Sequence, residues 1–134
     1  MATLTQEMKD MIGSQLNFLA TTDENGNPQV GPKGTMRVFD DTHLIYNEET
    51  GRHAWHNLQQ NGKAAVASVD RSKLKGFRFE GTVAIHKDDQ IFEDAQAFAK
   101  SKHLPAAIAA VVISVDRIIK LDAGPDAGTV IEEG

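Results

Sequence analysis

Residues 25–57 have the sequence NGNPQVGPKGTMRVFDDTHLIYNEETGRHAWHN, and this stretch decides the fold. Its Asn25-Gly26 pair predicts a tight hairpin turn, after which residues 28–39 return antiparallel to the preceding strand. Pro32 cannot donate a hydrogen bond to a β-ladder. The returning strand therefore has to lie at the edge of a sheet or break near Pro32, and either outcome frees backbone groups for a ligand.

The second half of the stretch predicts another strand and the start of a helix. Two aspartates form a turn before residues 43–47, which have the apolar character of a strand. Residues 52–60 have helical character, and Gly62 follows them as a stop signal. Strand, turn, strand and helix are thus expected to follow one another without a long loop.

Short strands and short helices continue on both sides of this stretch. Strands are predicted at residues 18–22, 64–69, 77–86 and 109–121, and helices after the N-cap Thr5 and from Asp88 or Asp89 to Lys100. Because the chain lacks the βαβαβ alternation of a doubly wound sheet, we expect a mainly β fold, a small six-stranded antiparallel barrel plugged by short helices. A single domain is predicted over residues 1–134, with the tail at residues 122–134 either disordered or held at an interface.

Composition narrows the classes of function. The chain has 134 residues, a formal net charge of −5 and no cysteine. The acidic balance argues against a nucleic-acid partner, and the lack of cysteine excludes disulfides, thiolate catalysis and iron–sulfur clusters. No apolar run approaches the roughly 20 residues of a membrane span, and the polar N-terminus lacks the apolar region of a secretory signal. A cytoplasmic protein without a membrane partner is therefore expected.

Two segments carry the candidate ligand-binding residues. Arg52 and His53 stand where a helix is predicted to begin, and the orphan N–H groups and dipole of a helix start favour an anion. From the residues alone, an ordinary solvated basic pair is the simpler interpretation. Residues 31–35, Gly-Pro-Lys-Gly-Thr, are only superficially like a phosphate-binding loop, because Pro32 breaks the Walker pattern.

Metal-dependent and hydrolytic chemistry find little support in the sequence. His53 and His56 have the spacing of a helical pair, but no third ligand accompanies them, so no metal site is predicted. No Ser-His-Asp order or paired-carboxylate arrangement indicates a hydrolase. The catalytic residues stay unidentified at this level.

The ordered set of motifs resembles the pyridoxamine-phosphate-oxidase-like family of FMN-binding split barrels, and within it the small FMN-binding proteins and general-stress flavoproteins. The resemblance extends from Thr5 to Leu121 and is carried by residues 18–22, 26–38, 50–58 and 76–83. It implies a six-stranded antiparallel split β-barrel with FMN as the cofactor. It also implies a homodimer in which FMN lies between the two subunits.

The resemblance further implies which residues contact the cofactor. Residues 30–37 would pass the isoalloxazine ring and residues 52–55 would take the phosphate, while Lys33 beside the ring would stabilise the anionic reduced flavin. His53-Ala54 stands where many relatives have Lys-Thr, so phosphate binding is expected to depend more on Arg52 and on backbone N–H groups. The implied cofactor-binding residues are Gly31, Pro32, Lys33, Gly34, Thr35, Met36, Thr50, Arg52, His53, Ala54 and Trp55.

Three functions remain open for such a protein. The first is an FMN-dependent oxidoreductase that passes hydride or electrons between NADH or NADPH and a small acceptor. The second is an FMN carrier or electron-transfer protein without its own substrate, and the third is a cofactor-free split barrel used for interaction or sensing. Pyridoxamine phosphate oxidation itself is disfavoured, because the chain is short and lacks an Arg-rich C-terminal segment.

A homodimer is also expected from the apolar surface that one chain would leave exposed. Trp55, the strand face that carries Phe77 and Phe79, and the Gly- and Pro-rich tail are the segments expected to contribute to that surface.

Overall fold

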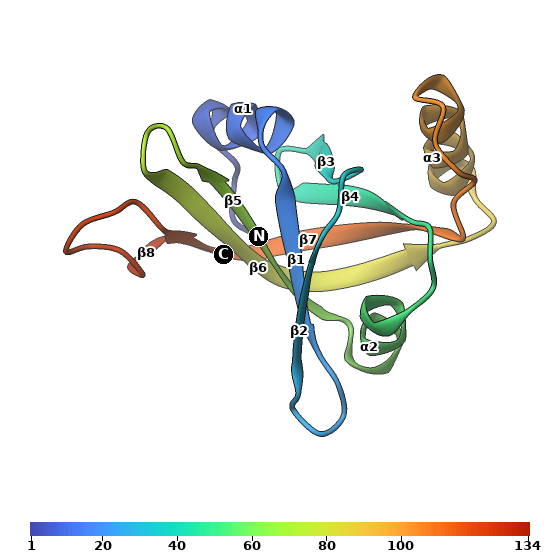
Figure 1. Ribbon diagram of the computed structural model, residues 1–134, viewed down its shortest axis with the longest axis horizontal. Helices are drawn as coiled ribbons and strands as arrows, with labels where there is room; N and C mark the ends of the chain where they lie inside the picture. The colour runs from blue at the N-terminus through green and yellow to red at the C-terminus, as the bar shows by residue number, and fades with distance from the viewer.

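Eight antiparallel strands and three short helices make up the protein, and the computed structural model describes all of residues 1–134 (Figure 1). In chain order the elements are α1 (Gln6–Ser14), β1 (Asn17–Thr22), β2 (Pro28–Pro32), β3 (Arg37–Asp40), β4 (His43–Glu48), α2 (His53–Asn61), β5 (Lys63–Asp70), β6 (Lys75–His86), α3 (Gln90–Ser101), β7 (Ala109–Lys120) and β8 (Val130–Glu133). The mainly β antiparallel class predicted from the sequence is confirmed. The strands number eight rather than six, because the expected strand at 28–39 is divided into β2 and β3 and the tail adds β8.

The order of the strands shows where the barrel is split. It runs β2-β1-β5-β6-β7-β4-β3, with β8 added beside β7. The two ends of this order, β2 and β3, are neighbours in the chain but are not paired with each other. Between them Lys33 N donates to Asn17 O and Met36 N donates to Lys33 O, which makes a turn instead of a ladder. β2 thus lies at an edge and ends at Pro32, as the missing N–H of proline requires.

The interior of the barrel is filled by side chains from the inner faces of the strands. Leu19, Val66 and Phe79 lie side by side across β1, β5 and β6 and are at most 1% exposed. Phe77 is 5% exposed and belongs to the same core cluster. The expectation that Phe77 and Phe79 present an apolar face to a partner is therefore wrong, because both rings are buried in their own chain.

A glycine allows β6 to cross β7 closely. The register between these two strands shifts between Glu80 and Gly81, which marks a β-bulge. A Cβ atom built on Gly81 would lie only 1.8 Å from the carbonyl oxygen of Ser114 in β7. No residue with a side chain fits this crossing without moving the two strands apart.

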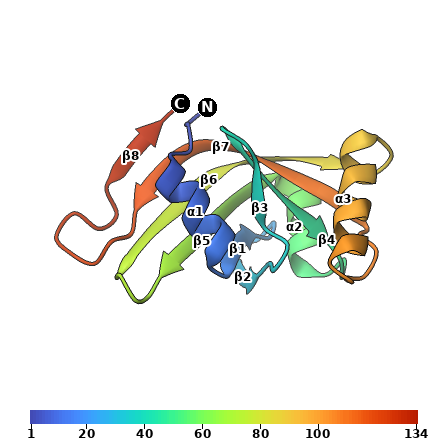
Figure 2. The same ribbon diagram turned by 90° about the horizontal axis from the view of Figure 1, so that it is seen from above.

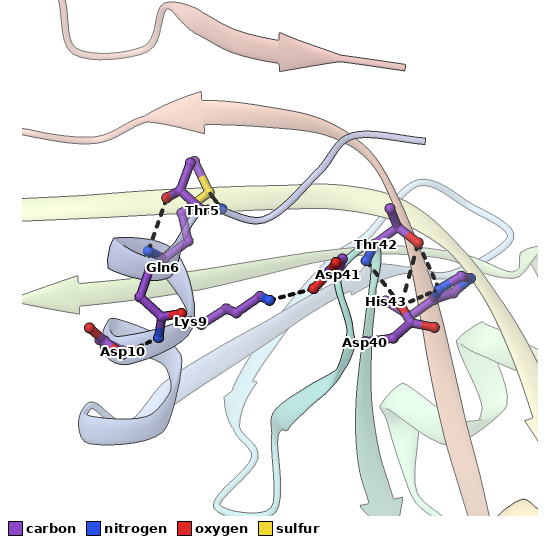
Figure 3. A network of polar contacts seen from close by, with 9 residues as sticks. Thr5, Gln6, Lys9, Asp10, Asp40, Asp41, Thr42 and His43 are labelled. Carbon is purple, nitrogen blue, oxygen red and sulfur yellow. Dashed lines mark hydrogen bonds and ion pairs between the residues drawn. The ribbon is translucent and has the colours of Figure 1, made fainter.

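Helix α1 is fixed at both its start and its side (Figure 3). The Thr5 side chain accepts a hydrogen bond from Met8 N, and the Met8 sulfur accepts one from Thr5 N, so the predicted N-cap is confirmed as a capping box. Lys9 pairs with Asp41 in the turn between β3 and β4. The helix is thereby held across one end of the barrel.

The C-terminal tail is paired within its own chain. β8 lies antiparallel to the end of β7, with Arg117 opposite Glu133, although all four of its residues are exposed. The two chain ends lie next to each other in both views (Figure 2). The tail is thus ordered as a strand, and a role at an interface remains a prediction. No helix of the protein is long and apolar enough to cross a membrane.

A candidate ligand site at the split of the barrel

A cavity of about 250 Å³ opens where the barrel is split, between β2, the end of β4 and the start of α2. We call it the split cavity. Its lining residues are Leu19, Gln29, Gly31, Pro32, Lys33, Glu48, Thr50, Arg52, His53, Ala54 and Trp55. The two segments singled out from the sequence thus meet at one place, although two strands, β3 and β4, separate them in the chain (Figure 1).

Three of the predicted residues do not line the split cavity. Gly34, Thr35 and Met36 form the connection between β2 and β3, and Thr35 and Met36 are each 5% exposed. The Thr35 hydroxyl accepts a hydrogen bond from Asn47 N at 2.9 Å. This contact ties the connection to β4, so the Thr35 hydroxyl is used within the fold and does not face into the cavity.

The start of α2 presents free positive charge to the split cavity. Arg52 is the N-cap residue, yet no side chain accepts a hydrogen bond from the first N–H groups, and the first turn contains no acidic residue. The nearby ion pairs join Lys33 to Glu48 and His56 to Glu24, and neither Arg52 nor His53 takes part in one. Both side chains are exposed. An uncapped helix start with two unpaired basic residues is a site that favours an anion.

Buried polar contacts fix the position of α2 on the barrel. Asn57, which is 4% exposed, donates from Nδ2 to the Thr21 hydroxyl at 3.0 Å. Thr21 in turn donates to Gln29 Oε1 at 3.2 Å, so α2, β1 and β2 are joined in one chain of contacts. Gly62 ends the helix with a positive φ of 68°, as the sequence predicted. The basic start of α2 is therefore held at a fixed place on the cavity rim.

Glu48 lines the split cavity and was not predicted from the sequence. Its side chain is 1% exposed, and it accepts hydrogen bonds from the Tyr46 hydroxyl at 3.2 Å, from Thr50 N at 3.3 Å and from Gly51 N at 3.1 Å. Burial and the charge of Glu48 raise the pKa of Tyr46 far above its usual value. Tyr46 thus stays protonated and remains a donor to the carboxylate.

Lys33, directly after the end of β2, faces the same carboxylate. Its Nζ lies 3.7 Å from Glu48 Oε1 and 5.3 Å from the centre of the Tyr46 ring. Only 20% of the Lys33 side chain is exposed. Lys33 and Glu48 therefore offset one another, and the unpaired positive charge of the split cavity comes from Arg52.

A second, larger hollow lies on the outer face of the sheet and contains none of the predicted site residues. Its volume is about 770 Å³, and residues of β1, β2, β5, β6, β7 and β8 line it. At its edge Arg117 contacts Glu80 at 2.7 Å and Glu133 at 3.9 Å. No group of three His, Asp or Glu side chains anywhere in the protein is arranged to hold a metal ion.

Comparison with known proteins gives a consistent set of relatives. The family model for pyridoxamine 5'-phosphate oxidase matches residues 4–122. HupZ of Group A Streptococcus has 42% sequence identity and a TM-score of 0.86, with 93% of this chain and 99% of that chain covered. A Lactobacillus delbrueckii protein, provisionally assigned as a pyridoxamine 5'-phosphate oxidase, has 34% identity and a TM-score of 0.76 over 87% and 93% of the two chains. An FMN-binding protein of Syntrophomonas wolfei shares the fold with a TM-score of 0.73 at 16% identity, over 84% of this chain and 82% of that one.

Proposed function

We propose that this chain, which belongs to the pyridoxamine 5'-phosphate oxidase family, binds FMN at the split cavity and passes hydride or electrons between NADH or NADPH and a small acceptor. The observation that carries this proposal is the meeting of Lys33, Arg52 and His53 around one cavity at the uncapped start of α2. The fold shared with an FMN-binding protein of Syntrophomonas wolfei adds support.

The residues present suit the phosphate end of FMN. A phosphate monoester carries up to two negative charges, and the Arg52 guanidinium, the His53 ring and the free N–H groups of α2 are the unpaired donors at the cavity. The volume of about 250 Å³ is below the roughly 300–1,000 Å³ of cavities that enclose a drug-sized ligand. The cavity of one chain is thus large enough to bind the phosphate group but too small to enclose all of FMN.

A second copy of the chain is the partner that we propose to complete the site. The outer face of β2, β1 and β5 exposes Val30, Phe18 and Val69 by 67%, 41% and 46%. The strand registers place these three side chains on the same face of the sheet. This face replaces the Phe77 and Phe79 face as the apolar surface that a homodimer would cover.

Bound FMN would supply the redox chemistry, and the residues of the chain would bind and orient it. Arg52 and His53 would hold the phosphate, and Gly31 and Pro32 would bring the backbone of β2 against the ligand without a large side chain. Lys33 would place a positive charge beside it. An FMN carrier without its own substrate is the alternative, because the flavin supplies the redox chemistry in either case and Glu48, the one carboxylate in the split cavity, already accepts three hydrogen bonds and pairs with Lys33.

Titration with flavins tests the proposal. FMN added to the purified protein should lose its fluorescence, and riboflavin should bind more weakly by a factor of ten or more, because it lacks the charged group that charge-assisted hydrogen bonds of about 1.5–3 kcal/mol each would hold. Arg52→Ala should weaken FMN binding, whereas Arg71→Ala, in the exposed turn between β5 and β6, serves as the matched control.

The outcomes separate the three functions. Reduction of the bound flavin by NADH or NADPH without oxygen supports the oxidoreductase. Binding without reduction by either nicotinamide favours the carrier. Equal affinity for FMN and riboflavin refutes the phosphate assignment, and a failure to bind any flavin leaves only the cofactor-free barrel.

A further inference from the structure

The buried carboxylate of Glu48 has no part in the binding proposed above, although it lies in the wall of the split cavity. A buried charge is costly unless it is paired and hydrogen-bonded. Here the chain supplies that compensation from three separate segments: Tyr46 in β4, the backbone after β4, and Lys33 after β2. Such an arrangement fixes the place of the carboxylate and compensates for its burial.

Three hydrogen bonds and one ion pair take up most of the binding capacity of the Glu48 carboxylate. A carboxylate offers about four acceptor positions. The Tyr46 hydroxyl and Lys33 Nζ approach Oε1, while Thr50 N and Gly51 N donate to Oε2. Because a carboxylate has no proton to donate to an anion, Glu48 acts on a bound anion through its charge and through the groups that it positions.

Those groups are the ones that meet an anion. Thr50 and Gly51 directly precede Arg52, so Glu48 takes up two N–H groups that an incoming phosphate would otherwise find next to the start of α2. Lys33 is held on the opposite wall with its charge offset. Glu48 is thus an internal anion inside a site that attracts anions.

We propose that Glu48 is a positioning residue that weakens the hold of the split cavity on anions by offsetting Lys33 and occupying the N–H groups of Thr50 and Gly51. The effect of Glu48 on anion binding does not depend on FMN being the ligand, whereas its effect on flavin reduction rests on the proposed function. There Glu48 lowers the stability of the negatively charged reduced flavin more than that of the oxidised flavin, because reduction adds negative charge near Lys33. Bound flavin is thereby kept a stronger reductant than Lys33 alone would allow.

Three variants separate this role from a merely structural one. Glu48→Gln keeps the shape and one acceptor oxygen but removes the charge, so it should raise FMN affinity roughly tenfold, the scale of one partly screened charge–charge interaction. Lys33→Met should lower the affinity by a similar factor, since it leaves the negative charge without a counter-charge. The double variant restores a neutral pair and should lie within about threefold of the wild-type protein. Glu93→Gln, on the exposed side of α3, is the control for a change in overall charge.

The reduction potential of the bound flavin provides the second measurement. Glu48→Gln should move it to a more positive value and Lys33→Met to a more negative one. Thermal unfolding of each variant shows whether the barrel is intact. If Glu48 only supports the fold, Glu48→Gln should weaken FMN binding and the double variant should bind worst of all, and either result overturns the proposal.

A probe without the flavin ring makes the test independent of the cofactor. Inorganic phosphate, followed through the His53 ring resonances by NMR, should bind more tightly to Glu48→Gln than to the wild-type protein. If the wild-type protein binds no FMN, the proposed function falls, and the phosphate titration alone decides the role of Glu48. Equal or weaker phosphate binding by Glu48→Gln refutes that role.

Discussion

Gly81→Ala should be strongly destabilising, because a single methyl group has no room at the crossing of β6 and β7. The new Cβ would lie 1.8 Å from Ser114 O and 2.9 Å from Ser114 C, and real Cβ contacts shorter than 3.0 Å are essentially never found. Both obstructing atoms belong to the backbone, so no rotamer change relieves the overlap and the strands have to separate. Overpacking costs about 1–3 kcal/mol where side chains can yield, so we expect a loss of at least about 3 kcal/mol here.

The same substitution at Gly13 provides a control of opposite sign. Gly13 is an exposed residue inside α1 with no atom within 4 Å of an added Cβ. Alanine there should stabilise the protein by about 0.5–1 kcal/mol, because it favours the helix and restricts the unfolded chain.

Urea and thermal unfolding followed by circular dichroism measure both changes. The melting temperature of Gly81→Ala should fall by roughly 10 °C, given about 3–4 °C per kcal/mol for a domain of this size. A Gly81→Ala variant within about 0.5 kcal/mol of the wild-type protein, the usual range of a neutral surface change, would refute the close crossing.

Two further predictions concern the site and the assembly. Arg52→Ala should weaken FMN binding in fluorescence titrations, because it removes a permanent positive charge from the proposed phosphate site. His53→Lys should keep or tighten the binding, since it adds such a charge there, and weaker binding would place His53 away from the phosphate. Val30→Asp should convert a homodimer into a monomer, since it puts a charge into the apolar outer face of β2, and light scattering that gives 14.6 kDa for the wild-type protein would refute the dimer itself.

Local chemistry made most of the fold predictable. Thr5 and Asp89 cap α1 and α3 as their side chains suggest, Gly62 ends α2, and Pro32 ends an edge strand. Each of these residues acts within a few positions of the chain, so no knowledge of distant contacts is needed. The strand count was missed because Pro32 was predicted to give an edge or a break and the structure shows both, and because the tail forms β8.

The site was predicted in part for the same reason. Arg52 and His53 follow from a helix start, and Lys33 follows from its place beside Pro32. Glu48 was missed because its burial depends on donors from β4, from the turn after β4 and from Lys33 just after β2, which come together only in the folded chain. The sequence could have indicated Glu48 by its position at the end of the apolar residues of β4. A carboxylate that a strand carries into the interior requires hydrogen-bond or charged partners.

Alternation assigned the side chains of β6 to two faces but could not say which face is inside. The strand registers decide this, because they align Phe18, Ala67 and Arg78 in one row across β1, β5 and β6, and Leu19, Val66 and Phe79 in the next. A guanidinium without a buried partner cannot be placed in the core of a small barrel at an acceptable cost. The row that contains Arg78 must therefore face outward, which carries Phe18 to the surface and buries Phe79. Once the pairing is known, one charged residue thus determines which aromatic rings are available to a second copy of the chain.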